Sequence, residues 1–287
     1  MKTGLCRALS LPIFLIASLG ATAAQWSDTS INYRYGNRYG EPFEGNDISK
    51  NILGFTHVSG YQYGTNFLNV DFLFSDSKDP SSANSKDGAH EVYLVYRHTL
   101  DLGKAGACAC QFGPIRGIGL TGGFDFNTKT DAGYNSKKRM WVAGPTAMLD
   151  VPGFLNISLL ALWESNAPYN SFTGVSTPRY RYDTHAMLNV AWGIPVAEGR
   201  VPWAFEGFAN FIAQKGKNEF GRDTRAETNI DMQLMADISA LLGAPQKTVK
   251  AGLEYQYWKN KFGNDAAGPA GSGAFAKTPM VRLEYHF

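Results

Sequence analysis

The chain of 287 residues has few charged side chains, no long basic segment and three cysteines. Charged residues make up 18% of it, whereas soluble domains carry about 25%. Aromatic residues reach 13%, which excludes a disordered or low-complexity chain. The formal net charge is only +2, and the longest basic run is Lys137-Lys138-Arg139. A folded protein that does not bind nucleic acid is therefore expected.

Long apolar runs are absent too. The longest apolar stretch, residues 9–19, follows Lys2 and Arg7 and precedes the small residues 21–23. A membrane anchor would need about 20 apolar residues, so residues 1–24 are predicted to be a cleaved secretory signal peptide. Its removal takes away two basic residues and leaves residues 25–287 formally neutral, as a single domain.

An exported chain without an apolar helix is either soluble or a transmembrane β-barrel. Residues 226–238 decide between them, because uncharged residues from Ala226 to Ile238 alternate with polar ones from Glu227 to Asp237, and only Met235 breaks the series. Soluble strands usually have about five or six residues, whereas a strand that crosses a bilayer needs about 9–11. A soluble β-sandwich would have shorter strands, so the barrel is favoured.

Similar alternation recurs along the chain and predicts an all-β, antiparallel transmembrane barrel of about twelve strands. Ten or fourteen strands remain possible, because three segments are weakly patterned: either face of residues 50–59 could be apolar, residues 111–126 are rich in glycine, and Pro145 suggests a bulge in residues 137–150. In residues 153–164, Leu160 and Leu162 interrupt the polar face. The expected strands are 28–37, 50–59, 65–75, 90–100, 111–126, 137–150, 153–164, 180–192, 202–213, 225–239, 248–259 and 278–287.

The connecting segments give the barrel an orientation. The turn at residues 151–153 is short, whereas residues 76–89, 165–179 and 260–277 are long and rich in Ser, Gly, Pro, Asn and Asp. Short turns are typical of the periplasmic side and long loops of the extracellular side. The terminal Phe287 is the kind of residue that outer-membrane barrels present to the barrel-assembly machinery. The bacterial outer membrane is therefore the expected location.

The polar face of each strand predicts which side chains line the lumen. The charges have both signs: Arg34, Arg97, Arg139, Arg181, Lys250 and Arg282 against Asp71, Asp125, Glu164, Asp183, Glu206, Glu227, Asp231, Asp237 and Glu254. Phe67, Asn69, Tyr93 and Phe208 are also expected to face inward. Such a lumen favours small neutral polar solutes, because rings can stack on aromatic side chains while polar groups bond their edges. Alternatively, these charges are interlocking ion pairs that only stiffen the barrel.

Other chemistry has weak support in the sequence. The five histidines lack metal-binding spacing, and no serine is tied to His185 and Asp183, so neither a metal, a cofactor nor an enzymatic activity is expected. Cys108 and Cys110 fall in an expected periplasmic turn, where the oxidising compartment makes a disulfide between them plausible.

Several local motifs point to a known family. They include Arg34-Tyr35-Gly36, the segment from His57 to Gly64, Phe112-Gly113-Pro114-Ile115-Arg116 and Val151-Pro152-Gly153-Phe154. In these motifs the chain resembles the nucleoside-specific channel-forming family of Gram-negative outer membranes, the Tsx-like group, in its OmpK-type branch. The resemblance is dense over about residues 26–155. It implies a monomeric twelve-stranded barrel with a narrow pore for nucleosides, and in some members a surface that phages use.

Two functions therefore remain open from the sequence. The first is a passive outer-membrane channel for small polar solutes, with nucleosides as the leading candidate. The second is a narrow or closed barrel whose extracellular loops act as a receptor or adhesion surface.

Overall fold

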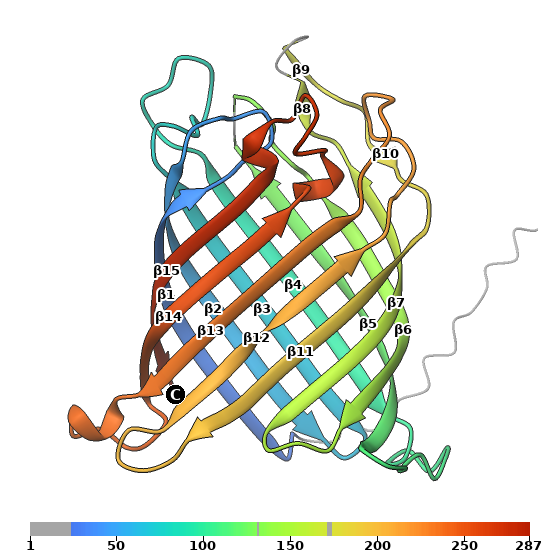
Figure 1. The fold of residues 1–287 in the computed structure, drawn as a ribbon, viewed down its shortest axis with the longest axis vertical. Coiled ribbons are helices and arrows are strands. Elements are labelled where there is room, and N and C mark those ends of the chain that lie inside the picture. Colours follow the sequence, from blue (N-terminus) through green and yellow to red (C-terminus); the bar gives the residue numbers. More distant parts are fainter. Residues whose placement is uncertain (1–23, 131, 171–173) are drawn as a thin grey trace, which may run out of the picture.

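The computed structural model describes residues 24–130, 132–170 and 174–287, and these form one closed β-barrel (Figure 1). The predicted signal peptide lies almost wholly outside the described residues and stays a prediction. No helix in the described part of the chain is long and apolar enough to cross a membrane.

Twelve long antiparallel strands make the barrel wall. They are β1 (Trp26–Tyr39), β2 (Ile48–Tyr61), β3 (Gly64–Ser75), β4 (His90–Asp101), β5 (Ile115–Lys129), β6 (Arg139–Leu149), β7 (Phe154–Asn166), β11 (His185–Ala197), β12 (Trp203–Ile212), β13 (Glu227–Asp237), β14 (Val249–Lys259) and β15 (Phe275–His286). The short strands β8 (Tyr169–Asn170), β9 (Val175–Ser176) and β10 (Tyr180–Arg181) and the 3-10 helices η1 (Ser239–Leu241), η2 (Lys261–Gly263) and η3 (Ser272–Ala274) lie in the connections.

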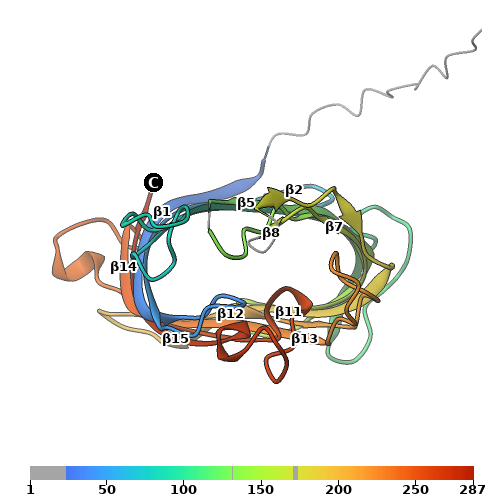
Figure 2. The ribbon, with the colours of Figure 1, turned by 90° about the horizontal axis from the view of Figure 1, so that it is seen from above.

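Closure of the sheet joins the two ends of the chain. Each long strand pairs with its sequence neighbour, β7 pairs with β11, and β15 pairs with β1 so that Ser30 lies opposite His286 and Gly36 opposite Met280. Seen from above, the barrel is oval, with β2 and β5 along one long side and β11, β12 and β13 along the other (Figure 2). The prediction of about twelve strands is confirmed, including the weakly patterned strands β2, β5 and β6.

The two ends of the barrel differ as the sequence predicts. The short turns lie at the end that carries the C-terminus, and the long loops with β8 and β9 lie at the opposite end (Figure 1). The turn between β6 and β7 is tight because Gly153 has φ +77°, and a Cβ there would lie 2.0 Å from the carbonyl oxygen of Gly193. Short turns mark the periplasmic side of outer-membrane barrels.

Pro145 does not cause the expected bulge. The pairing of β6 with β7 lapses at residues 144–145 and resumes in the same register, with Ala143 opposite Ala161 and Thr146 opposite Ser158. The register shift in this part of the sheet lies instead between Ile115 and Gly117 of β5. A missing donor therefore interrupts the ladder here without inserting a residue.

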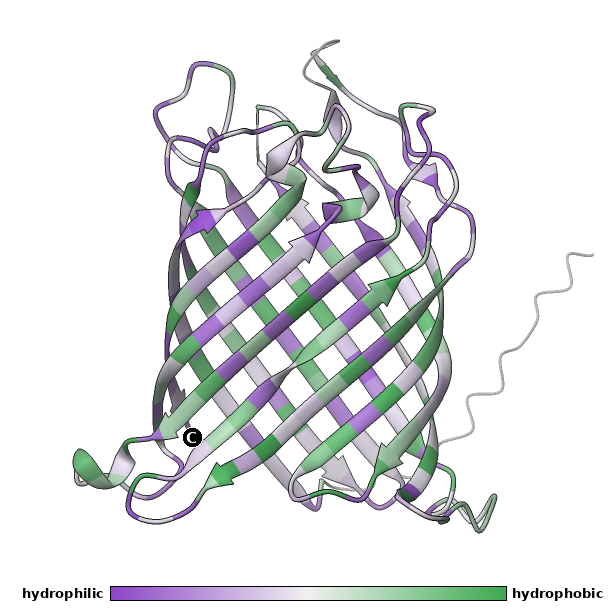
Figure 3. Cartoon of the chain, viewed as in Figure 1, coloured by the Kyte–Doolittle hydropathy of each residue, from purple (hydrophilic) through white to green (hydrophobic). Residues whose placement is uncertain are grey.

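Hydrophobic and hydrophilic residues alternate along the strands (Figure 3). The exposed fractions show that the apolar side chains point outward. Leu253 of β14 is 67% exposed and Leu234 of β13 is 42% exposed, whereas the neighbouring Glu254 is 2% exposed. An apolar outer wall and a polar interior are stable only where lipid replaces water outside the barrel. The closed barrel with this outer wall is a protein of the bacterial outer membrane.

The face assignment predicts opposite effects at two adjacent residues of β13. Leu234 faces lipid, whereas Gln233 faces inward and donates to Glu206 at 3.1 Å. We expect Leu234→Arg to destabilise the inserted barrel by about 2–4 kcal/mol, because it places a charge near the middle of the bilayer. Gln233→Arg places a positive charge beside the carboxylate of Glu206 and should be tolerated. Folding into lipid vesicles, followed by the gel shift between heated and unheated samples, measures both, and equal losses would contradict the assignment.

Candidate functional site

The lumen is the candidate functional site, and strand register decides which side chains enter it. Asp71 of β3 lies opposite Tyr93 of β4, and Tyr93 lies opposite Asn127 of β5, so all three share the inner face. By the same parity, sixteen of the predicted lumen residues face inward: Arg34, Phe67, Asn69, Asp71, Tyr93, Arg97, Asp125, Glu164, Glu206, Phe208, Glu227, Asp231, Asp237, Lys250, Glu254 and Arg282.

Four of these residues form a buried ion-pair network on the inner wall. Arg34 pairs with Asp71 and lies 3.5 Å from Glu254, while Arg282 donates to Glu254 at 2.8 Å and to Glu284 at 2.6 Å. The network joins β1, β3, β14 and β15, and the side chain of Glu254 is 0% exposed. Charges in so dry a setting need partners, since an unpaired one would cost several kcal/mol. These charges therefore narrow the lumen and stiffen its wall.

A second group lies across β4, β5 and β6. Arg97 donates to Asp125 at 2.5 Å, and the hydroxyl of Tyr93 donates to Asp125 at 3.3 Å. Lys138 in turn donates to the Tyr93 hydroxyl at 3.2 Å. The side chain of Arg97 keeps 19% of its surface exposed, so this group is paired yet still reaches the solvated part of the lumen.

Partly exposed side chains that face inward mark the solvated part of the lumen. Phe67 of β3 is 38% exposed although it faces inward, and Asn69 beside it is half-buried. On the opposite long side of the oval, Phe208 and Asn210 of β12 and Asn189 of β11 are also half-buried (Figure 2). Water therefore reaches aromatic faces and uncharged amides on both walls, which together can hold a flat polar solute.

An apolar cluster occupies the inner wall of β6, β7, β11 and β12. Leu160 and Leu162, which interrupt the polar pattern of their strand, face inward and pack with Met140, Val142, Met187 and Ile212. Toward the outer end of this cluster, Glu164 accepts from Lys215 at 2.7 Å and lies 3.6 Å from His185. The interruption in the sequence pattern thus marks an apolar patch inside the barrel.

The extracellular mouth is covered by its own loops. Glu41, in the loop after β1, accepts from Lys50 at 2.5 Å and from Lys261 at 2.8 Å, and lies 3.4 Å from Lys129. Asp79 adds contacts of 2.9 Å to Lys129 and 3.7 Å to Lys50. We call these five residues the outer ion-pair cluster. Beside it, Tyr134, Trp258, Phe262 and Ala276 form a buried apolar cluster.

The carboxyl group of Glu41 favours its charged form. Burial alone would raise the pKa of its carboxyl group, but the charges of Lys129, Lys261 and Lys50 outweigh burial and keep the pKa well below its usual value. A carboxyl group with a depressed pKa stabilises the folded state at higher pH and loses that contribution only as the pH falls through the depressed value. Glu41 therefore stays charged in mildly acidic solution.

Three predicted lumen residues lie elsewhere. The strand expected at residues 180–192 begins only at His185, so Arg181 and Asp183 are not on β11. Arg181 lies opposite Ser165 on the outward-facing side of β7, and both it and Asp183 are exposed. Arg139 is outward too, because Met140 takes the inward position. The alternation of polar and apolar residues continues through residues 180–184, but the pairing of β11 with β7 begins only at His185.

The outer ion-pair cluster was not foreseen from the sequence. Lys50 opens an expected strand whose two faces could not be told apart, and Glu41 and Lys261 lie in loops 220 positions apart. In the sequence, only the position of Lys50 at the start of an expected strand pointed to this cluster. Cys108 and Cys110 do form a disulfide. Among the described residues, no His, Cys, Asp or Glu side chains gather in threes as a metal site requires.

The first prediction for the lumen concerns Glu41. Glu41→Gln leaves three lysines without their shared carboxylate, which should destabilise the closed loops by about 3–5 kcal/mol. We expect a higher single-channel conductance in planar bilayers. Glu44→Gln, in the same loop, is the control, because the side chain of Glu44 accepts only from Asn46 in the described contacts. A folded Glu41→Gln barrel with unchanged conductance would show that the cluster does not close the mouth.

A second prediction concerns pH. Since the pKa of Glu41 lies well below its usual value, the wild-type conductance should be the same at about pH 5 as at about pH 7. A conductance that rises over this range as acid is added would mean that Glu41 titrates there and is not held by its lysines.

Among known proteins, the chain has similar solved structures. No family model matches the chain, and no curated protein matches it. Solved structures that are similar include the KdgM porin in complex with disordered oligogalacturonate, at 10% identity over 90% of this chain and 99% of that chain, with a TM-score of 0.44. An outer membrane channel from Pseudomonas putida F1 has 12% identity over 91% and 95%, with a TM-score of 0.49. The translocator domain of the autotransporter NalP from Neisseria meningitidis has 13% identity over 91% and 88%, with a TM-score of 0.43.

Proposed function

We propose that this protein is a passive outer-membrane channel for small polar solutes, with nucleosides as the leading candidates. The observation that carries the proposal is the solvated part of the lumen, where Phe67 and Asn69 on one wall and Phe208, Asn189 and Asn210 on the opposite wall point inward and stay partly exposed. Aromatic rings can stack on a nucleobase, and amides can bond its edge or the sugar hydroxyls. The motif resemblance to the Tsx-like family supports nucleosides independently.

The paired charges of the lumen favour neutral solutes. Arg34, Arg97 and Arg282 each have a carboxylate partner, so these three guanidinium groups attract an anion less strongly than unpaired ones would. A charged solute would have to displace one partner and leave the other buried and unpaired, which is costly. A nucleoside carries no phosphate and avoids this cost. The pore is therefore expected to pass neutral solutes in preference to charged ones, without catalysis.

The decisive measurement is the single-channel conductance of the refolded barrel, titrated with adenosine and thymidine. A small conductance that either nucleoside blocks in a saturable manner supports the proposal. Conductance that neither nucleoside blocks would support a channel but contradict nucleosides as its solute. The Glu41→Gln variant belongs in the same series, because closed outer loops would hide the lumen.

Two phenylalanines of β3 provide a matched pair for locating the site. Phe67 faces the lumen and is 38% exposed, whereas Phe72 faces lipid and is 44% exposed. Loss of a stacking contact of about 1–3 kcal/mol should weaken nucleoside block by about 5-fold to 100-fold in Phe67→Ala. Phe72→Ala should leave the block unchanged. A block that survives in Phe67→Ala would place the solute elsewhere.

A second function, as a receptor or adhesion surface, has one observation in its favour. The extracellular loops pack into a fixed surface, and a hollow of about 740 Å³ lies there, lined by residues that include Ser81, Lys86, Asp87 and His90. If neither the wild-type barrel nor the Glu41→Gln variant conducts, this second function would be favoured. The barrel is expected to act as a monomer, with Phe287 exposed at the periplasmic edge for the assembly machinery.

A further inference from the structure

The two longest periplasmic turns contain long uncharged segments. Residues 105–115, from the turn after β4 to the first residue of β5, contain no charged side chain, and neither do residues 238–246 of the turn between β13 and β14; each turn carries one lysine near an end, Lys104 or Lys247. The extracellular segment 213–226, by contrast, carries six charged residues: Lys215, Lys217, Glu219, Arg222, Asp223 and Arg225. A turn surrounded by water on all sides has no physical reason to avoid charge so completely.

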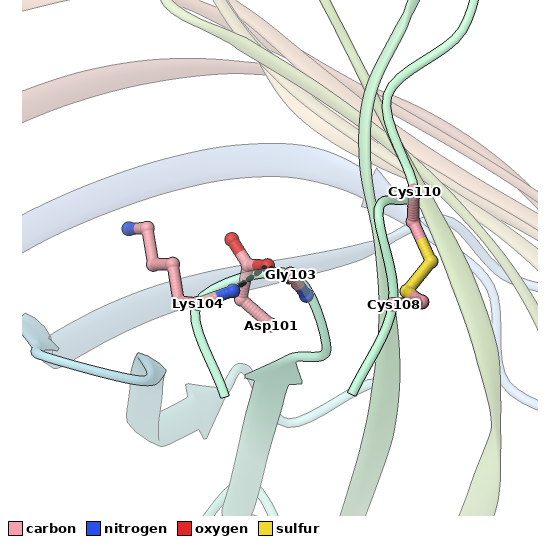
Figure 4. The surroundings of a disulfide bond; sticks show 5 residues. All are labelled: Asp101, Gly103, Lys104, Cys108 and Cys110. Atoms are coloured by element: carbon pink, nitrogen blue, oxygen red, sulfur yellow. Dashed lines mark hydrogen bonds between the residues drawn. A yellow bond between two sulfur atoms is a disulfide. The ribbon is translucent and has the colours of Figure 1, made fainter. Parts of the chain in front are cut away.

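These uncharged turns hold apolar side chains away from the rest of the protein. Phe112 is 60% exposed in the first turn, and Leu241 and Leu242 are 57% and 61% exposed in the second. In the first turn, Cys108 and Cys110 are joined in a disulfide, so they carry no ionisable thiol (Figure 4). Asp101 accepts backbone N–H groups of Gly103 and Lys104 and fixes the start of this turn, at 3.0 and 3.2 Å (Figure 4).

Both turns project sideways rather than straight into the periplasm. The turn that carries η1 extends outward beyond the barrel wall near β14 in the side view and in the view from above (Figures 1 and 2). The turn between β4 and β5 extends beyond the wall in the other direction (Figure 1). Because lipid surrounds the barrel wall, a segment that leaves the wall sideways at this level enters the region of the lipid headgroups.

We propose that residues 105–115 and 238–246 are two periplasmic feet, which insert Phe112, Leu241 and Leu242 into the inner leaflet of the outer membrane. The feet continue the lipid-facing surface, since Leu253, Leu283 and Tyr285 on β14 and β15 are exposed on the same outer wall. Phe and Leu side chains next to basic residues are typical of segments that lie in a membrane interface.

The charges beside the feet fit this position. Lys104 and Arg116 flank the first foot, and Lys247 follows the second, all three exposed. Their cationic groups can reach lipid phosphates while the apolar residues enter the boundary of the acyl chains. The feet would fix the depth and tilt of the barrel from two sides, independently of any solute in the lumen.

The test compares three single-cysteine positions labelled with an environment-sensitive fluorophore in the full mature chain. Phe112→Cys and Leu242→Cys place the label on the feet, and Glu198→Cys places it on the charged turn between β11 and β12. The native cysteines are paired and do not take the label. Each variant is folded into phosphatidylglycerol-containing vesicles at low protein density, and the heat-dependent gel shift confirms folding.

We expect blue-shifted emission at positions 112 and 242. A nitroxide on the lipid headgroup should quench these labels at least about twofold more strongly than the label at position 198, while aqueous iodide should do the reverse. Labels on the feet that iodide quenches as strongly as at position 198 would overturn the proposal. Blue-shifted emission without quenching by the lipid nitroxide would overturn it too, because a protein surface would then cover the feet.

Discussion

Closure of the sheet is the constraint on which the rest of this structure depends. The β1–β15 pairing leaves no unpaired strand edge in the wall, so the backbone hydrogen bonds can be satisfied within lipid. Once the sheet closes, each strand must present one face to lipid and the other to a narrow interior. The polar side chains of opposite strands are then brought close together in this interior. Ion pairs form there for that reason, among Arg34, Arg282, Glu254 and Asp71.

The same constraint explains which parts of the structure could be predicted. A period of two is a local property, and it identified all twelve strands and the inward position of residues such as Arg34, Asp71 and Glu254. It failed where alternation continues without a partner strand, at Arg181 and Asp183, and where Met140 rather than Arg139 takes the inward position. Whether a patterned segment joins the ladder depends on its neighbours, which the pattern does not contain.

The loops were beyond prediction for a different reason. Glu41 and Lys261 meet only because closure brings the first and last extracellular loops together, although 220 positions separate them. Neither residue belongs to a periodic segment. The inward-facing Leu160 and Leu162 are an intermediate case, since the interruption is visible in the sequence but its meaning, an apolar patch with Met187 and Ile212, requires the neighbouring strands.

A covered mouth and a conducting pore are compatible if the cover and the wall are held by different interactions. The wall depends on backbone ladders around the whole barrel, whereas the cover depends on side chains that converge on Glu41. Ion pairs between loops can break without any loss of ladder hydrogen bonds, so the loops can open while the wall stays intact. The partly exposed residues Phe67 and Asn69 belong to β3 in the wall and not to the outer ion-pair cluster. Access to the lumen and recognition within it are therefore separable properties of this barrel.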